Sequence, residues 1–412
     1  MIESDGGLKH LAFFEELGKM DESDAGWRAV SAGLVTMRLV DRWIAVGSTS
    51  KLDSWSVSAA RETIAQVADT TPTRRILTSI VDVMVACTAT DMHALSPRLM
   101  AYGQALEYEA KWALAADVYS SIAAYTHPVD DADLAVGASL QLGFCRKTLG
   151  DLDLAAAGYR RAVELASAVN DRVGMLRGRL GDAKVTLDRG NLPSAEAALD
   201  AIINEARAHG FDDVQSRALV DRALAAGIRG EHSQAIRFSY DALVLSRSPR
   251  TRERILTNIA TGFRYLGNTE IARNAYLVLA ATAQEQFIRW NSLINLIELS
   301  ASDGNELQFD RYRRELEAAN LTPQLRATYL LHVGRGYLLL GQRSSAIDAL
   351  EEALSFAAEH RLNQLSFEID AALSDAKRAA SPKPTTYQAE WNADLDDVVL
   401  AIDSMKQLAG VG

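Results

Sequence analysis

Cysteines and clustered metal ligands are scarce in this chain. Only 2 of its 412 residues are cysteines, Cys87 and Cys145. Two cysteines so far apart form neither a disulfide framework nor a four-ligand zinc site, so we expect two buried, reduced thiols. The 7 histidines stand in separate segments, none four residues from another and none close to a cysteine. We therefore expect no metal site and no cofactor.

Long apolar runs are missing as well. No apolar stretch reaches the roughly 20 residues that are needed to cross a bilayer. The best candidate, residues 76–86, is interrupted by Asp82. The first residues are acidic and polar, and they lack the basic and apolar regions of a secretory signal. The sequence thus predicts a soluble, cytoplasmic protein with no membrane partner.

Positive charge is in deficit. Lys and Arg number 43 against 54 for Asp and Glu, which gives a net charge of −11 at pH 7. Because nucleic-acid-binding domains are typically basic, a nucleic-acid partner is disfavoured. The apolar share of 48% and the charged share of 24% exclude wholesale disorder. The length allows two to four domains or one extended array. Abundant Ala and Arg are typical of a bacterium with GC-rich coding.

The common catalytic motifs are also missing. The chain has no GxxxxGK[ST] loop, no GxGxxG after a strand, no GxSxG and no HExxH. The glycines of residues 174–181 stand in an expected helix, so we interpret them as helix contacts rather than a phosphate loop. The acidic clusters at 130–133, 212–213 and 394–397 are interpreted as solvated loops and helix N-termini. We therefore expect a non-enzymatic protein with no catalytic residues.

A repeated pattern of small and aromatic residues is present instead. Within residues 140–166 these residues are Gly143, Gly150, Ala155, Tyr159 and Ala162. Small side chains let two helices cross closely, and the aromatic ring fills the remaining volume. Gly150 is expected to end a first helix, because glycine tolerates the left-handed conformation there. Asp151 is then expected to cap a second helix.

The same frame recurs along the chain every 37 to 40 residues. The turn position falls on Ala110, Gly150, Gly190, Gly230, Gly267, Gly304 and Gly341. Five residues after the turn stands alanine in six repeats and Phe309 in the other. Seven residues before the turn stands a small residue in six repeats and Ile297 in the other. Because both exceptions fall within residues 291–316, we expect that helix pair to stay apart or to cross differently, with loose packing around Phe309.

These residues and spacings resemble the tetratricopeptide repeat (TPR), a pair of antiparallel helices. The resemblance implies an all-α solenoid, a right-handed superhelix of seven helix pairs, and no run of strand type argues against it. We expect an N-terminal helical bundle at residues 1–94, seven TPR-like repeats at 95–376, and a linker with an amphipathic helix at 377–412.

Several element boundaries can be predicted within this layout. In the N-terminal bundle we expect helices at 24–47, 54–67 and 73–89, which would cover the apolar face of the first repeat. Ser96-Pro97 and Thr322-Pro323 are expected to begin first helices, and no proline is expected inside a repeat helix. The last elements are expected to be a helix at 362–380, a linker at 381–386, and a helix at 394–408 that docks back or binds a partner.

The resemblance also implies a concave groove that is lined by five positions of each first helix. Seven of the 35 mapped positions are basic and three are acidic, a balance of +4. The basic residues are Lys147, Arg177, Lys184, Arg217, Arg254, Arg264 and Arg335, and the acidic ones are Glu107, Asp188 and Glu298. The apolar residues are Met100, Tyr108, Leu140, Phe144, Tyr265, Leu331 and Leu338. This lining suits an acidic, partly hydrophobic peptide, although Arg stems that merely cover apolar surface would give the same pattern.

Two functions are compatible with this layout, since a fold does not fix a function. The favoured one is a scaffold or adaptor that binds a peptide or protein segment in the groove. In the alternative, the chain is similar to bacterial peptide-sensing regulators, whose repeats bind a signal peptide while an N-terminal bundle acts on a response regulator or on DNA. A bundle packed as a cap would favour the adaptor, and an exposed one the regulator.

Overall fold

The chain is built from helices. The computed structural model describes residues 9–47, 52–87, 91–378 and 393–411. These residues form twenty α-helices and a short 3₁₀ helix, with no strand among them, so the predicted all-α fold class is confirmed. No helix in these stretches is long and apolar enough to span a bilayer. The predicted linker at 381–386 and the first eight residues lie outside the described residues.

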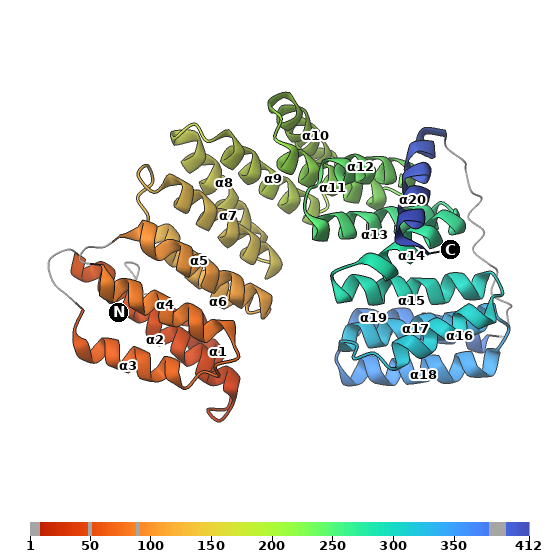
Figure 1. Ribbon diagram of the computed structural model, residues 1–412, viewed down its shortest axis with the longest axis horizontal. Coiled ribbons are helices and arrows are strands. Elements are labelled where there is room, and N and C mark those ends of the chain that lie inside the picture. Colours follow the sequence, from red (N-terminus) through yellow and green to blue (C-terminus); the bar gives the residue numbers. More distant parts are fainter. Residues whose placement is uncertain (1–8, 48–51, 88–90, 379–392, 412) are drawn as a thin grey trace. The chain divides into compact units, whose positions relative to one another are not determined.

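The helices fall into two compact units, Met1–Ile202 and Ile203–Gly412, with the boundary inside one helix (Figure 1). Unit 1 contains α1 (Leu11–Leu17), α2 (Ala25–Val46), α3 (Ser54–Ala65), α4 (Pro72–Ala86), α5 (Met92–Tyr108), α6 (Trp112–Tyr125), α7 (Ala132–Thr148), α8 (Leu152–Ala168), α9 (Arg172–Asp188) and most of α10 (Leu192–His209). Unit 2 contains α11 (Asp212–Ile228), α12 (His232–Leu245), α13 (Pro249–Tyr265), α14 (Thr269–Thr282), α15 (Gln286–Ser302), α16 (Glu306–Glu317), α17 (Pro323–Leu339), α18 (Arg343–Glu359), α19 (Asn363–Lys377), η2 (Ala393–Leu395) and α20 (Asp396–Ala409). The three helices predicted for the N-terminal bundle are confirmed as α2, α3 and α4, whereas the short helix α1 was missed.

Seven helical hairpins run from α5–α6 to α17–α18, and each turns at the predicted position. All seven turn residues have a positive φ, from 57° at Ala110 to 86° at Gly150. This left-handed conformation is strained for a side chain with a Cβ, which explains glycine at six of the seven turns. The repeat frame derived from the sequence is therefore confirmed.

Close helix crossings at small residues hold the hairpins together. A Cβ atom placed on Gly143 of α7 would lie 2.9 Å from the ring of Tyr159, and one on Gly181 of α9 would collide with the same ring. The Tyr159 ring of α8 thus fills the space between two successive first helices. A Cβ on Gly178 would meet Val163 at 2.5 Å. The interpretation of residues 174–181 as helix-contact glycines is confirmed.

Two expectations about helix starts were wrong. Helix α5 begins at Met92 and not at Ser96, because the Asp91 side chain caps it by accepting from the Ala94 N–H at 3.2 Å. Pro97 therefore lies inside this helix, where it removes one backbone hydrogen bond. Asp151 stands at the N-cap of α8 but makes no capping bond; it accepts from Arg146 instead, at 3.4 Å. Thr322 does cap α17, as expected.

The pair α15 and α16 packs differently from the other hairpins, as expected: the next first helix, α17, packs mainly against α15 and only weakly against α16. The expected loose packing around Phe309 was wrong. Phe309 of α16 is 1% exposed, and Ile297 of α15 is fully buried. A Cβ on Gly336 of α17 would collide with the Phe309 ring, whose centroid also lies 5.1 Å from that of Tyr337. The large side chain in α16 is therefore matched by a glycine in the next first helix.

We predict that Phe309→Ala destabilises the protein by about 3–5 kcal/mol, because a fully buried ring leaves a cavity against Gly336. Leu307→Ala on the same helix is the control, since its side chain is exposed and its loss should change stability by less than about 0.5 kcal/mol. Urea unfolding measures both. Equal effects would mean that the Phe309 site collapses freely.

A buried charge cluster ties α1 to α2 and α6. The Nδ1 atom of His10 lies 2.5 Å from a carboxylate oxygen of Asp117, and its Nε2 atom lies 3.3 Å from Asp41. Tyr125 donates a hydrogen bond to Asp41. Burial would lower the pKa of His10, but hydrogen bonds and charge from Asp117 and Asp41 outweigh it and raise the pKa to about 9. His10 is thus an imidazolium held between two carboxylates at neutral pH.

The pH dependence of stability should reveal this cluster. The folded-state pKa of His10, about 9, lies above the ordinary value of 6.5. The stabilisation of the folded protein by protonated His10 is therefore complete below pH 6.5 and is lost as the pH rises through about 9. Between these limits the protein should lose about 2–3 kcal/mol, and His10→Gln should abolish that loss. Urea unfolding at both pH values is the test, with the exposed His360→Gln as control. An unchanged pH dependence in His10→Gln would contradict the assignment.

Candidate functional site

The mapped groove positions of neighbouring first helices lie side by side. Lys147 of α7 forms an ion pair with Asp188 of α9 at 3.0 Å in unit 1. In unit 2 Arg264 of α13 lies 3.8 Å from Glu298 of α15. In each unit we call the surface made by these positions its first-helix face. It comprises positions of α5, α7 and α9 in unit 1 and, separately, of α11, α13, α15 and α17 in unit 2.

Large apolar side chains are exposed on the first-helix face. Their exposed fractions run from 38% to 94%. They are Tyr108 and Phe144 in unit 1, and Leu224, Ile228 and Tyr265 in unit 2. Leu331 was expected to join them, but it is buried in the core and cannot contact a partner. Leu224 and Ile228 occupy the same register positions as Phe144 and Tyr265, so the mapping from the sequence places them on this face as well.

Neighbouring groups hold two of these rings in place. The ring of Phe144 meets Trp112 edge to face, with 5.7 Å between centroids. Tyr265 stacks on His232 at 4.9 Å, and the Arg264 guanidinium lies 5.5 Å from the Tyr265 centroid. Rings fixed in this way lose little conformational entropy when a ligand packs on them.

Most of the predicted groove cations already have partners. Lys147 pairs with Asp188, Arg264 pairs with Glu298, and Arg217 pairs with Asp213 one turn earlier on its own helix. Arg177 and Lys184 also interact with other residues. The balance of +4 counted from the sequence therefore overstates the charge that is available to a ligand.

Arg254 and Arg335 differ from the other five. Within the part of the chain that the structure describes, neither forms an ion pair or a hydrogen bond through its side chain. Arg254 is exposed on α13, and Arg335 is half-buried on α17. Arg335 acts on Glu298 only through longer-range charge. These two cations are the ones best placed to meet an acidic ligand.

Glu298 links three successive first helices. Its carboxylate lies 2.8 Å from Nδ1 of His332 on α17, in addition to its contact with Arg264 on α13. Burial would raise the pKa of Glu298, but the His332 hydrogen bond and the charges of His332, Arg264 and Arg335 lower it to about 2. His332 occupies no mapped groove position, so sequence reasoning had no signal for its role.

We predict that Glu298→Gln destabilises the protein by about 1–3 kcal/mol, because Arg264 and His332 lose their anionic partner in a partly buried site. The exposed Glu352→Gln on α18 should have almost no effect. Thermal unfolding at neutral pH compares the two variants with the wild type. A Glu298→Gln protein as stable as the control would show that the cluster contributes no net stability.

The cysteines match their predicted state in part. Both are free thiols; Cys145 is buried, as expected, but Cys87 is only half-buried. Burial, together with the charge of Glu107, raises the pKa of Cys145 to about 12, so its thiolate is scarcely populated. Glu107, the remaining acidic groove residue, also accepts from the Tyr119 hydroxyl at 2.7 Å.

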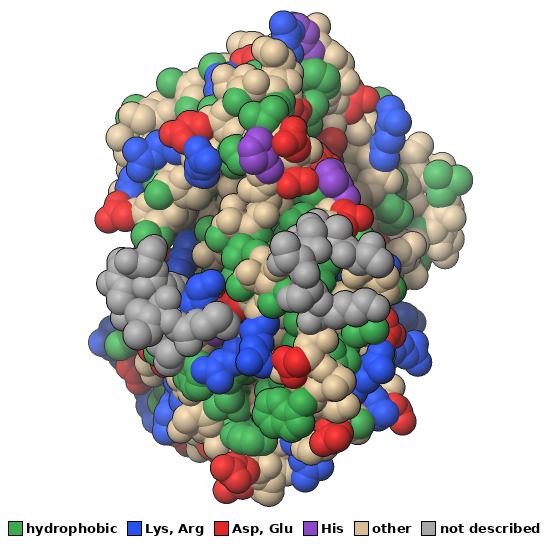
Figure 2. Space-filling view, turned by 90° about the vertical axis from the view of Figure 1, so that its left-hand side faces the viewer, with side chains coloured by type: hydrophobic (Ala, Val, Ile, Leu, Met, Phe, Trp, Pro, Cys, Tyr) green, Lys and Arg blue, Asp and Glu red, His purple; other side chains and the backbone are tan. Residues whose placement is uncertain are grey.

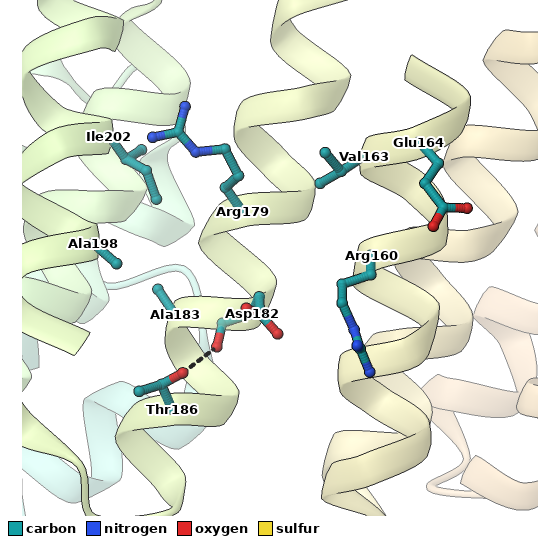
Figure 3. Close-up of a pocket in the computed structure, with 9 residues that line it drawn as sticks. All are labelled: Arg160, Val163, Glu164, Arg179, Asp182, Ala183, Thr186, Ala198 and Ile202. Carbon is teal, nitrogen blue, oxygen red and sulfur yellow. Dashed lines mark hydrogen bonds between the residues drawn. The ribbon is translucent and has the colours of Figure 1, made fainter. Parts of the chain in front are cut away.

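A pocket of about 420 Å³ lies between α8, α9 and α10 (Figure 3). Its charged lining is balanced, with Arg160 and Arg179 against Glu164 and Asp182. Thr186 donates its hydroxyl hydrogen bond to the backbone oxygen of Asp182 at 3.0 Å, so this hydroxyl is already committed. None of the residues predicted for the groove lines this pocket.

Figure 2 shows acidic, basic and apolar side chains interspersed on the side of the molecule that carries the N-terminal helices. Among the described residues no group of three or more His, Cys, Asp or Glu side chains could hold a metal ion.

Comparisons with known proteins find similarities to solved structures only. No family model matches the chain, and no curated protein matches it. A tetratricopeptide repeat protein from Parabacteroides merdae is similar over 68% of this chain and 98% of its own, with 13% identity and a TM-score of 0.43. The Rap conjugation gene regulator of the plasmid pLS20 is similar over 92% of this chain and 96% of its own, with 12% identity and a TM-score of 0.45. The quorum sensor NprR from B. thuringiensis is similar over 88% of this chain and 92% of its own, with 15% identity and a TM-score of 0.41.

The hairpins themselves define the class of protein. The chain is an all-α protein built from TPR-like helical hairpins, each turning at a left-handed residue.

Proposed function

We propose that the chain is a non-enzymatic adaptor whose first-helix face binds an acidic, partly hydrophobic peptide or protein segment. One observation carries the proposal. In unit 2 this face exposes Leu224, Ile228 and Tyr265, while Arg254 and Arg335 have no ion pair with any described residue. Apolar surface and unpaired cations on the same set of helices match a ligand that offers both apolar side chains and carboxylates.

The two kinds of residue would contribute differently. Covering exposed apolar side chains gains about 25 cal/mol for each Å² removed from water. Cations that already pair with a carboxylate gain little from a second one, so Arg254 and Arg335 would supply most of the charge recognition. Charge complementarity of this kind raises association rates and selects acidic ligands over basic ones.

The packing of the N-terminal bundle supports an adaptor rather than a regulator with a separate output module. One buried core runs from Phe13 and Met37 in the bundle to Tyr102, Tyr119 and Cys145 in the first hairpins. A bundle that shares its core with the repeats acts as a cap, covering apolar surface that the first hairpin would otherwise expose.

The double reversal Arg254→Glu/Arg335→Glu should weaken binding of the partner about 10-fold or more, because two attractive contacts become repulsive. The partner segment is first identified by affinity capture from native cells and then titrated as a synthetic peptide. Affinity for the wild type should also fall with added salt, since partly exposed charges are screened over about 8–10 Å.

The matched control is Arg311→Glu/Arg314→Glu, which makes the same charge change on the second helix α16, where both side chains are exposed. It should leave the affinity almost unchanged. If both double variants lost the same affinity for the peptide, the loss would come from the change in net charge and not from the first-helix face. Binding that does not depend on salt would also reject this face as the binding surface.

A further inference from the structure

The last helix, α20, packs on second helices of unit 2. Of the two alternatives for the helix expected at 394–408, docking on the repeats is therefore the one observed. In Figure 1 it is the dark blue helix beside α12 and α14. It packs against α14, and the preceding turn η2 packs against α12. Leu395, Val398 and Ile402 are buried beneath it, whereas Leu400 and Leu408 on its other side are exposed.

Polar contacts fix the position of α20. The Arg237 guanidinium of α12 donates to both carboxylate oxygens of Asp397, at 2.8 and 2.9 Å. Asn274 of α14, itself buried, donates its amide to Asp403 at 3.1 Å. Both contacts come from the same nitrogen, Nη1, and this charge-assisted contact favours a carboxylate at this point of the surface. The other terminal nitrogen of Arg237, Nη2, donates to Oδ1 of Asp241 at 2.8 Å.

The repeat array does not need α20 to complete its core. Helix α14 already packs against α13 and α15, as a second helix of the array does. With η2, helix α20 contributes three buried apolar side chains, the half-buried Val399 and Met405, and the polar contacts made by Arg237 and Asn274. A terminal helix that packs on the array through one face opens at lower free energy than the helices enclosed within it.

We propose that the α12–α14 surface is a second binding site, for an amphipathic helix of a partner protein, and that α20 is its resident occupant. The partner helix carries an aspartate in its first turn, apolar residues one and five positions later, and an aspartate directly after the second apolar residue. Asp397, Val398, Ile402 and Asp403 show this spacing in α20. Binding of such a helix in a groove between helices follows a known recognition mode. The site lies on second helices and does not depend on the first-helix face.

Because α20 is part of the same chain, it competes as an intramolecular ligand. A partner helix of equal intrinsic affinity therefore binds only when α20 leaves. The wild type should accordingly resist binding, and a variant with α20 released should bind readily.

The test uses the full chain and a fluorescent synthetic peptide of residues 393–411. Ile402→Glu releases α20 by placing a charge at a buried position, and this variant should bind the peptide at least about 10-fold more tightly than the wild type. Leu400→Glu is the matched control, because its side chain is exposed on the same helix, and it should behave as the wild type. Hydrogen exchange of the wild type should be faster in α20 than in α14.

Exchanging the charges of Arg237 and Asp397 tests whether this ion pair determines peptide affinity. Within the Ile402→Glu chain, the added change Arg237→Glu should lower peptide affinity at least about 10-fold, and a peptide carrying Asp397→Arg should restore it. Such rescue is not expected if α20 acts only as structural packing.

Three results would overturn the proposal. The Ile402→Glu chain could keep its helical circular dichroism and still bind the peptide no better than the wild type. It could instead lose its fold, which would make α20 a permanent part of unit 2. A wild-type dimer in solution that Ile402→Glu dissociates would place the α20 of a second copy on this surface in place of a partner helix.

Discussion

The close approach of helices at small residues is the constraint on which the structure depends. Where Gly143 meets the Tyr159 ring, no Cβ atom fits, and Gly181 meets the same ring from the next first helix. One ring therefore sets the spacing of three helices. Because interiors are packed to near crystal density, such contacts fix how far apart successive helices lie. The surface residues of neighbouring first helices come into register as a consequence.

Features that depend on local sequence could be predicted. The turns at Gly150 and its equivalents follow from the left-handed conformation that they require, and the crossings follow from side-chain size. The packing of Phe309 could not be predicted in the same way. Its partner, Gly336, lies 27 residues later in a different hairpin. The repeat frame compares equivalent positions but does not show which residues of different hairpins meet, so it wrongly predicted loose packing around Phe309.

The charge of the candidate site shows the same limit. Counting residues found seven cations on the mapped positions but could not reveal that Lys147 pairs with Asp188 or that Glu298 serves both Arg264 and His332. Such pairs join different helices and depend on side-chain direction. Among the residues that the structure describes, Arg254 and Arg335 are the mapped cations without an ion pair, and Leu224 and Ile228 are exposed on the same face.

The two sides of the hairpins carry different surface residues. First helices carry exposed aromatic and aliphatic side chains together with unpaired arginines, which suits an extended, acidic ligand. Second helices of unit 2 carry Arg237 and Asn274, which already hold a helix. On the two proposals made above, both surfaces would select a ligand through a few polar contacts and retain it through apolar side chains, as protein interfaces generally do.

Photo-crosslinking in living cells tests the central claim most directly. A photoreactive amino acid would replace Leu224 on the first helix α11 or, in a separate chain, Leu307 on the second helix α16; both side chains are exposed in unit 2. The account predicts that position 224 captures one recurrent partner, crosslinked through an acidic segment that mass spectrometry identifies, and that position 307 does not. Capture of the same partner from position 307 alone would contradict the assignment of the first-helix face as the binding surface.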